Sequence, residues 1–286
     1  MADRFPLPSI LRHNRLMQRP STPPKFTRRQ MALACGGGLL SSALRGASAS
    51  SHFRGVDINH VALRVSDLTR MEQFLRSHFG SANIHNMGPD WRFLRVERNF
   101  TALRKHGQPG LDHFCIAVED YEADAVEKKC RGLGLTTRRT ETWVYILDPD
   151  GIEVQLSVVD HDVDAPVVRA APETSTFKGT GINHVALRVS DIGRSRAFYQ
   201  EHFGVPVLRE TASNCFLGLG KNFLALFKNE KPGLDHYCYS IADYDPAAAM
   251  AKLEPLNLNA RRHDDRVYFD ASDGITIQLS SEDRQP

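Results

Sequence analysis

The chain has 286 residues, of which 41% are hydrophobic and 24% are charged, a composition typical of one or two globular domains with proper cores. The net charge is +2, but residues 1–49 carry eight basic side chains and one acidic one, leaving 28 basic and 33 acidic residues elsewhere. This acidic excess after residue 49 excludes the basic surface of a typical nucleic-acid-binding protein.

Residues 1–49 resemble a twin-arginine export signal. Arg28 and Arg29 precede Met31-Ala32, where the usual pattern has Phe-Leu, and a modest apolar run extends through Leu44 to the small-x-small site Ala47-Ser48-Ala49. The run is shorter than the about 20 residues that a permanent transmembrane helix needs. We therefore expect export to the periplasm or the extracellular space without stable membrane insertion. The alternative is a disordered basic tail.

One decapeptide occurs twice. Residues 58–67 read INHVALRVSD, and residues 182–191 repeat this sequence about 124 positions later. HFG, NF-x-AL and PGLDH recur in the same order, and the register holds as far as the QLS segments at residues 155–157 and 278–280. The chain is therefore a tandem duplication.

Each repeat contains two rounds of strand, helix and short strands. In repeat 1, residues 58–65 alternate as a strand, Asp67 is a helix N-cap, and Gly80 ends the helix. A second round begins after Pro109-Gly110. The other predicted elements of repeat 1 are strands at 91–96, 100–103, 111–118, near 137, 143–147 and 152–158, and a helix at about 122–133.

The layout resembles the vicinal oxygen chelate superfamily, which includes glyoxalase I, extradiol dioxygenases, fosfomycin-resistance enzymes and bleomycin-binding proteins. The resemblance rests on HVALRVSDL, GLDH and DPDGIEVQL. It implies an α+β fold of four βαβββ modules that pair into two cups. We expect a signal at 1–49, repeat 1 at 56–159, a linker at 160–179 and repeat 2 at 180–281.

The resemblance also implies a divalent metal site in each cup, with Fe(II) or Mn(II) favoured and Zn(II) as a further candidate. Its ligands come from the first strand of each module and the last strand of each repeat. Gln155 and Gln278 stand where the superfamily usually has Glu, so the ligand set lacks a negative charge. The expected ligands are His60, His113 and Gln155 in repeat 1 and His184, His236 and Gln278 in repeat 2.

Three further pairs of side chains are candidates for chemistry. Tyr145 and Tyr268 each precede the glutamine by ten residues, where a phenol can stabilise a substrate oxyanion. Asn99 and Asn222 stand near the place of the proton-transferring His of extradiol dioxygenases and are expected to orient substrate or oxygen. Arg64 and Arg188, four residues after the first histidines, are expected to bind a substrate carboxylate.

The favoured interpretation is an exported metal-dependent enzyme, dioxygenase-like or lyase-like, that acts on a small molecule with adjacent oxygens. The alternative is a metal-free protein of the bleomycin-resistance type that binds or sequesters a small molecule. No nucleic-acid partner is expected. The sequence leaves open the substrate, the oligomeric state, whether one or both cups work, and whether His60 shares a cup with His113 or with His236.

The signal generates the first prediction. Replacing Arg28 and Arg29 with Lys should stop processing and accumulation in the periplasm, because the twin-arginine pathway recognises the guanidinium pair. Fractionation of cells, followed by immunoblotting of the mature protein, measures this. Unchanged accumulation of the double variant would contradict the assignment.

Overall fold

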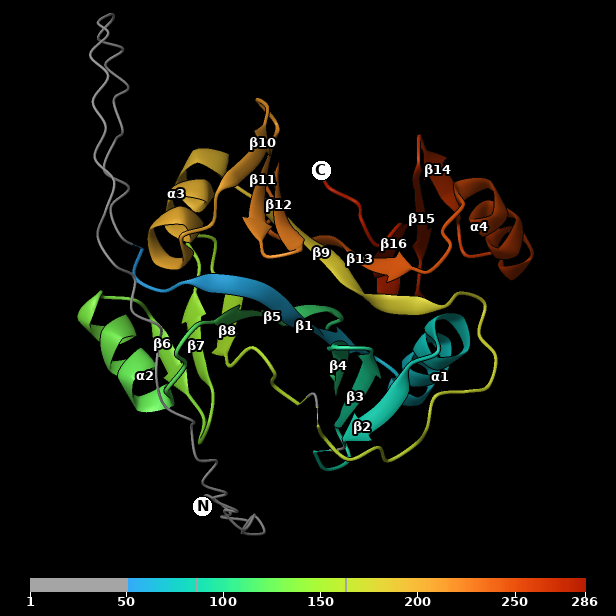
Figure 1. The fold of residues 1–286 in the computed structure, drawn as a ribbon, viewed down its shortest axis with the longest axis horizontal. Helices are drawn as coiled ribbons and strands as arrows, with labels where there is room; N and C mark the ends of the chain where they lie inside the picture. The colour runs from blue at the N-terminus through green and yellow to red at the C-terminus, as the bar shows by residue number, and fades with distance from the viewer. Residues whose placement is uncertain (1–50, 86, 163) are drawn as a thin grey trace, which may run out of the picture. The chain divides into compact units, whose positions relative to one another are not determined.

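A computed structural model describes residues 51–85, 87–162 and 164–286 (Figure 1). The predicted signal at 1–49 lies outside the described residues. In repeat 1 the elements are β1 Gly55–Val65, α1 Leu68–Phe79, β2 Ala82–His85, β3 Trp91–Val96, β4 Asn99–Lys105, β5 Gly110–Val118, α2 Ala123–Gly132, β6 Thr137–Arg139, β7 Val144–Leu147 and β8 Glu153–Ser157.

Repeat 2 follows the same order with two short 3-10 turns added. Its elements are β9 Gly179–Val189, α3 Ile192–Phe203, β10 Val207–Glu210, β11 Asn214–Leu219, β12 Asn222–Lys228, β13 Gly233–Ile241, α4 Pro246–Leu253, η1 Glu254–Leu256, β14 Arg261–His263, β15 Arg266–Asp270, η2 Ser272–Gly274 and β16 Thr276–Ser280. The predicted α+β fold of four βαβββ modules is confirmed.

The two modules of each repeat form one eight-stranded sheet. The strand order is β2-β3-β4-β1-β5-β8-β7-β6 in repeat 1 and β10-β11-β12-β9-β13-β16-β15-β14 in repeat 2. At the centre of each sheet the first strands of the two modules pair antiparallel, β1 with β5 and β9 with β13. The modules therefore pair within a repeat, which places His60 in the same cup as His113.

Local signals set the ends of the first helix of each repeat as predicted. The Asp67 carboxylate accepts a hydrogen bond from the backbone N–H of Arg70 at 3.0 Å, and Gly80 closes the helix at φ 68°. Asp191 and Gly204 repeat this arrangement around α3. A side-chain oxygen satisfies an orphan donor of the first turn, and glycine adopts the left-handed conformation without a Cβ clash.

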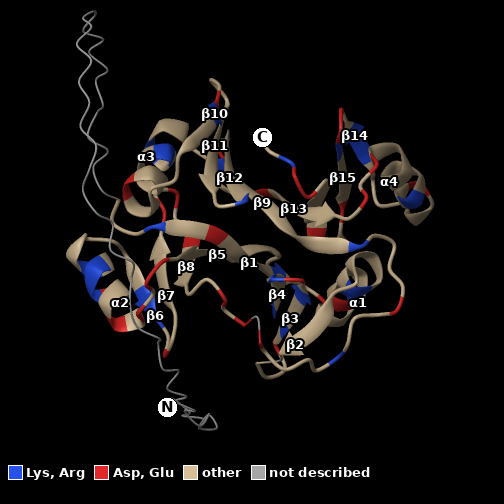
Figure 2. Ribbon diagram, in the orientation of Figure 1, with Lys and Arg blue, Asp and Glu red and all other residues tan. Residues whose placement is uncertain are grey.

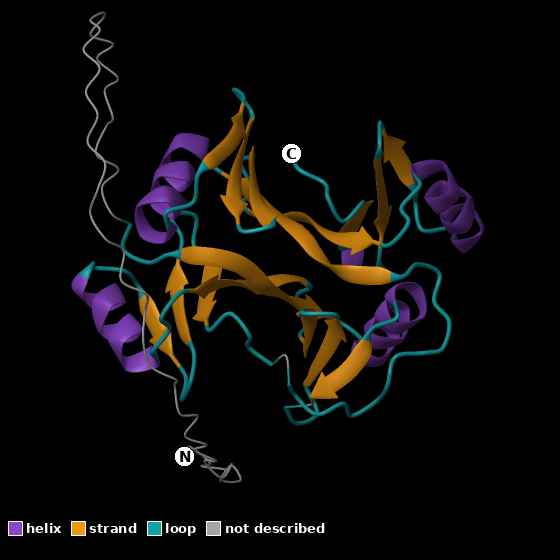
Figure 3. Ribbon diagram, in the orientation of Figure 1, coloured by secondary structure: helices purple, strands orange, loops and turns teal. Residues whose placement is uncertain are grey.

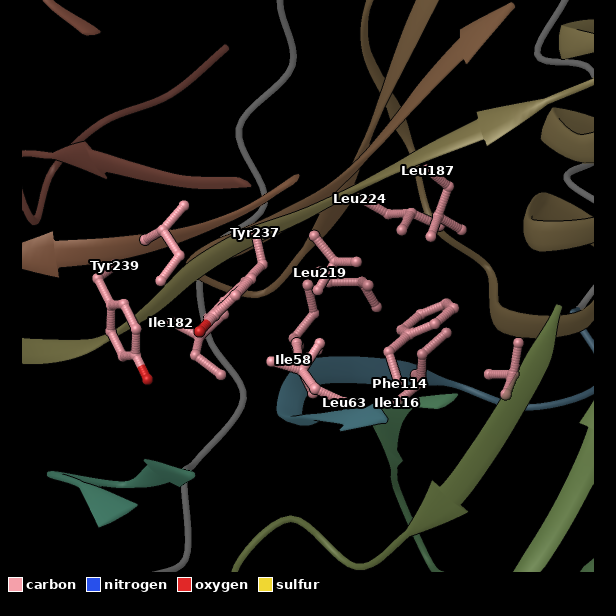
Figure 4. Close-up of a cluster of buried hydrophobic side chains, with 14 of the residues drawn as sticks. Ile58, Leu63, Phe114, Ile116, Ile182, Leu187, Leu219, Leu224, Tyr237 and Tyr239 are labelled. Atoms are coloured by element: carbon pink, nitrogen blue, oxygen red, sulfur yellow. The ribbon is translucent and has the colours of Figure 1, made fainter. Parts of the chain in front are cut away.

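Strand alternation separates a core face from a cup face. On β1, Val61, Leu63 and Val65 lie in the main core, whereas Ala62 belongs to a smaller cluster on the other face. The main core contains buried side chains of both repeats. Figure 4 shows Ile58 and Phe114 of repeat 1 beside Leu219 and Tyr237 of repeat 2. The described residues of the two repeats thus form one compact unit with a common core.

The repeated motif also joins the two repeats. Asp150, in the turn before β8, accepts hydrogen bonds from the backbone N–H and the hydroxyl of Ser190 at 3.2 and 2.6 Å. Asp273 accepts the same pair of bonds from Ser66. The serine of each VSD segment therefore anchors the turn of the other repeat, next to the helix that the following aspartate caps.

Helices cover the outer faces of the strands, as Figure 3 shows for α2 beside β6 and β7. In the part of the chain that the structure describes, no helix combines the length and the apolar character needed to cross a membrane.

The hydrogen bonds that join Asp150 to Ser190 of the other repeat lead to a stability prediction. Asp150→Ala should lower the free energy of unfolding by about 2 kcal/mol, because it removes charge-assisted hydrogen bonds from a carboxylate whose side chain is 3% exposed. The control is Asp160→Ala, which removes an ion pair with Arg98 whose aspartate is 72% exposed, and which should cost less than about 1 kcal/mol. Urea unfolding measures both, and equal losses would contradict a special role of Asp150.

Candidate functional site

Two histidines face each other at the floor of each cup. The Nε2 atoms of His60 on β1 and His113 on β5 are 3.2 Å apart, and those of His184 and His236 are 3.1 Å apart. All four side chains are buried. The antiparallel pairing places Ala62 opposite His113, so the two imidazoles project to the same face from neighbouring strands.

Hydrogen bonds at the other ring nitrogens fix the tautomers of these histidines. His60 Nδ1 donates to Asn59 Oδ1 at 2.8 Å, and His113 Nδ1 donates to Asp112 Oδ1 at 2.8 Å. Because these oxygens only accept, each Nδ1 carries the proton and each Nε2 carries a lone pair. Two lone pairs therefore point at each other, an arrangement that a cation between them stabilises. The donor set fits a divalent metal ion.

Asn59 has a second function in this arrangement. Its Nδ2 donates to the backbone oxygens of Val159 and His161, both at 3.4 Å. In repeat 2, Asn183 accepts from His184 at 2.8 Å and donates to the backbone oxygen of Arg284 at 3.3 Å. One asparagine per repeat therefore orients a histidine and ties down the segment that follows the last strand.

The glutamines and tyrosines lie beside the histidine pairs. Tyr145 on β7 is the direct ladder partner of Gln155 on β8, and Tyr268 is that of Gln278. Each glutamine side chain lies beside the first histidine of its cup. The Tyr145 ring meets His113 edge-on, with centroids 5.2 Å apart. The ten-residue spacing between each tyrosine and its glutamine thus reflects their pairing across a β-hairpin.

Burial determines the charge state of these groups. It lowers the pKa of His60 and of His184 well below the ordinary value, and the neighbouring histidine lowers each further. Burial also raises the pKa of Tyr145 to about 12. At neutral pH the first histidine of each cup is neutral, and Tyr145 retains its proton as a hydrogen-bond donor.

Comparison with known proteins identifies the family. Residues 181–249 match the model of the glyoxalase/bleomycin resistance protein/dioxygenase superfamily. A metallothiol transferase FosB from Staphylococcus haemolyticus is 30% identical over 121 residues, which cover 36% of this chain and 87% of the relative. The chain belongs to this superfamily. Glyoxalase I from Saccharomyces cerevisiae is 23% identical over 212 residues, covering 57% of this chain and 63% of the relative.

Solved structures of superfamily members share the fold. A Mn(II)-bound glyoxalase from Novosphingobium aromaticivorans aligns with a TM-score of 0.65 at 17% identity, over 81% of this chain and 84% of the other. Homoprotocatechuate 2,3-dioxygenase from Arthrobacter globiformis aligns with a TM-score of 0.68 at 16% identity, over 82% and 81%. Both alignments extend over more than one repeat of this superfamily chain.

Two expected site residues lie elsewhere. Asn99 donates to the backbone oxygen of Ile58 at 2.8 Å and accepts from the backbone N–H of Ile182 at 3.1 Å, at the junction of the repeats. Asn222 donates to the carboxylate of Asp57. On β4 it is the next residue, Phe100, that faces the cup and stacks on His60 at 4.3 Å. The geometry does not support a substrate-orienting role for Asn99 or Asn222.

The two expected carboxylate-binding arginines lie farther from the histidine pairs. Arg188 lines an outer chamber of cup 2 and donates through Nε to the backbone oxygen of Lys231 at 3.2 Å. Arg64 Nε has no hydrogen-bond partner among the described residues, and its guanidinium lies over Gly110. Both therefore remain candidates for contacts at the cup mouth.

The cups also contain side chains that the sequence did not reveal. His161 lies outside the predicted bounds of repeat 1, but it is buried, 5.7 Å from the His60 ring and 4.0 Å from the Trp143 ring. Its equivalent in repeat 2 is Arg284. The backbone oxygen of His161 accepts a hydrogen bond from Asn59, and that of Arg284 accepts one from the equivalent Asn183. Alignment of the repeats beyond the QLS segments was the signal that could have located both residues.

Acidic groups lie close to one histidine of cup 1. Ligand-type atoms of Asp112, His113 and Glu153 are within 4.8 Å of one another. Arg138 binds both oxygens of Glu153 at 2.7 Å and stacks on Tyr145 at 3.6 Å. Repeat 2 has Thr276 in place of Glu153, so the two cups differ in charge near otherwise matching histidines.

The tautomer assignment generates the third prediction. In protein freed of metal, ¹⁵N NMR of labelled histidine should show His60 and His184 neutral at pH 6 with the proton on Nδ1, because burial lowers the pKa of both rings and Nδ1 faces an amide oxygen. Variants with each histidine replaced by Gln would assign the signals. A doubly protonated ring at pH 6 for either residue would contradict the described geometry.

Proposed function

We propose that the protein is a metal-dependent enzyme whose His/His/Gln sets hold a divalent ion and whose substrate is a small molecule with adjacent oxygens. The observation that carries this proposal is the pair of facing Nε2 atoms in both cups. The ligands would be His60, His113 and Gln155 in cup 1 and their equivalents His184, His236 and Gln278 in cup 2.

The relatives support a metal of the first transition row. The most similar proteins include a Mn(II)-bound glyoxalase, a metallothiol transferase and an extradiol-type dioxygenase. Imidazole nitrogens with one oxygen donor suit Fe(II), Mn(II) or Zn(II). When bound, such an ion would supply a Lewis acid that polarises substrate oxygens.

Protein side chains would then control charge and protons around the substrate. Tyr145 and Tyr268, each beside a glutamine, would donate a hydrogen bond to a negatively charged substrate oxygen. In cup 1 His161, which lies beside His60, is the imidazole that would accept a proton, the function that Asn99 cannot supply. In cup 2 Arg284 takes this place.

The neutral glutamine ligand indicates an anionic substrate. A His/His/Gln set leaves both positive charges of a divalent ion uncompensated. A substrate that binds as a dianion would supply the negative charge that a glutamate ligand contributes in other members. We also propose that residues 1–49 act as an export signal.

Metal content tests the proposal. His113→Ala and His236→Ala should each remove about one equivalent of metal per chain, because two neutral donors hold a divalent ion poorly. His263→Ala is the control, since that side chain is 73% exposed on β14, and it should retain the wild-type content. Elemental analysis after anaerobic purification measures all three. Wild-type protein without any first-row metal would instead indicate a metal-free binding protein.

A further inference from the structure

The two cups have the same residues at the floor but different residues around the opening, which we call the rim. At three equivalent rim positions, repeat 1 has aromatic or imidazole side chains and repeat 2 has arginine. The equivalence follows from the ladders, since His85 pairs with Phe93 on β3 as Arg209 pairs with Phe216 on β11. In chain order, the replacements are His85 by Arg209, Trp143 by Arg266 and His161 by Arg284.

The rim of cup 1 contains aromatic and imidazole rings in contact with one another. His161 contacts both Trp143 and Phe100, with centroids 4.0 and 5.6 Å apart. Ala165, farther along the same segment, packs against the cluster that includes Phe93. These contacts hold His161 beside the histidine pair of cup 1.

The rim of cup 2 surrounds a cavity. A recess of about 30 Å³ is lined by both histidines and by Arg209, Arg266 and Arg284. It adjoins a chamber of about 560 Å³ that shares Arg266, His236 and Tyr268 with the recess. Figure 2 shows basic residues on β14 and on the segment that leads to the C-terminus.

The guanidinium groups have little compensation inside the cavity. Arg188, Arg261 and Arg262 line the outer chamber, and Asp235 is the one acidic residue in the lining of either space, within the described part of the chain. Asp235 itself holds His236 at 2.7 Å. The lining thus carries six arginines against one acidic side chain.

The contacts that hold the three rim arginines in place do not neutralise their positive charge on the side of the recess. Arg209 stacks over Phe216, 4.7 Å from the ring centroid. Arg284 pairs with Asp265, a side chain that is 63% exposed. Arg266 approaches Asp264 at 3.7 Å, while its buried Nε has no hydrogen-bond partner among the described residues. An unpaired buried donor of a guanidinium group is costly unless a ligand accepts from it.

The recess that the three arginines line extends to both histidines of the floor. Guanidinium groups bind carboxylate and phosphate oxygens through paired donors, and a partly enclosed site strengthens that attraction.

We propose that cup 2 is a binding site for a small oxyanion with at least two negative charges, held by Arg209, Arg266 and Arg284. The site needs no metal, because the arginines alone provide the donors. Cup 1, which has His85, Trp143 and His161 in the equivalent places, lacks these arginines and does not bind such an anion in the absence of metal. The duplication has therefore produced two sites with different ligands.

Isothermal titration calorimetry of the full chain, dialysed against EDTA so that no metal contributes, tests this proposal. Oxalate and inorganic phosphate are the probes, and the uncharged oxamide is the control ligand. We expect one site per chain for at least one of the two anions and none for oxamide. A stronger response to oxalate assigns a dicarboxylate ligand, and a stronger response to phosphate assigns a phosphate ligand.

Variants locate the site. Arg266→Gln and Arg284→Gln should each weaken binding at least about tenfold, the scale of a charge-assisted contact. Arg131→Gln, which removes an exposed arginine of α2 that is paired with Glu127, should bind as the wild type does. Both tryptophans, Trp91 and Trp143, belong to repeat 1, so tryptophan fluorescence should not respond to the anion.

Three results would overturn the proposal. These are the absence of binding by both anions, wild-type affinity in both arginine variants, and a change in tryptophan fluorescence on titration, which would place the anion in cup 1. None of these results bears on the metal content of the wild-type protein, so failure of this proposal is distinguishable from failure of the proposed enzymatic function.

Discussion

The antiparallel pairing of the two central strands in each sheet is the constraint on which the site depends. It brings one imidazole from β1 and one from β5 to the same face, with Nε2 atoms 3.2 Å apart. The neighbouring β8 runs parallel to β5 and places Gln155 opposite Cys115. Because the ladder hydrogen bonds fix this register, the donors converge without loops or flexible segments.

The buried histidine pair would be unfavourable without its outer hydrogen bonds. Asn59 and Asp112 fix both tautomers, and Asn59 also holds the segment that covers the cup. The same amide therefore links the orientation of a ligand to the position of the rim. This double function accounts for an identical asparagine-histidine pair in both repeats, where a change at asparagine would disturb the floor and the rim together.

The duplication has kept the floor and changed the rim. The histidines, glutamines and tyrosines lie in equivalent places in both cups, and so do the asparagines that orient the histidines. The differences are in side chains that come from β2, from the residue before β7 and from the segment after the last strand, or from their equivalents in repeat 2. Rim residues decide which molecule reaches the floor, so divergence there would separate the ligands of two cups whose floors match.

The sequence by itself determined features that depend on local periodicity and on the comparison of the repeats. The resemblance to the superfamily selected His60, His113 and Gln155 as a ligand set, and the helix ends at Asp67 and Gly80 follow from capping chemistry. Only the tertiary structure decided which modules share a sheet, because both pairings satisfy the same strand patterns. It also turned Asn99 to the junction of the repeats and brought His161 and Arg284 over the cups. These placements depend on hydrogen bonds between residues distant in the chain, which no local pattern encodes.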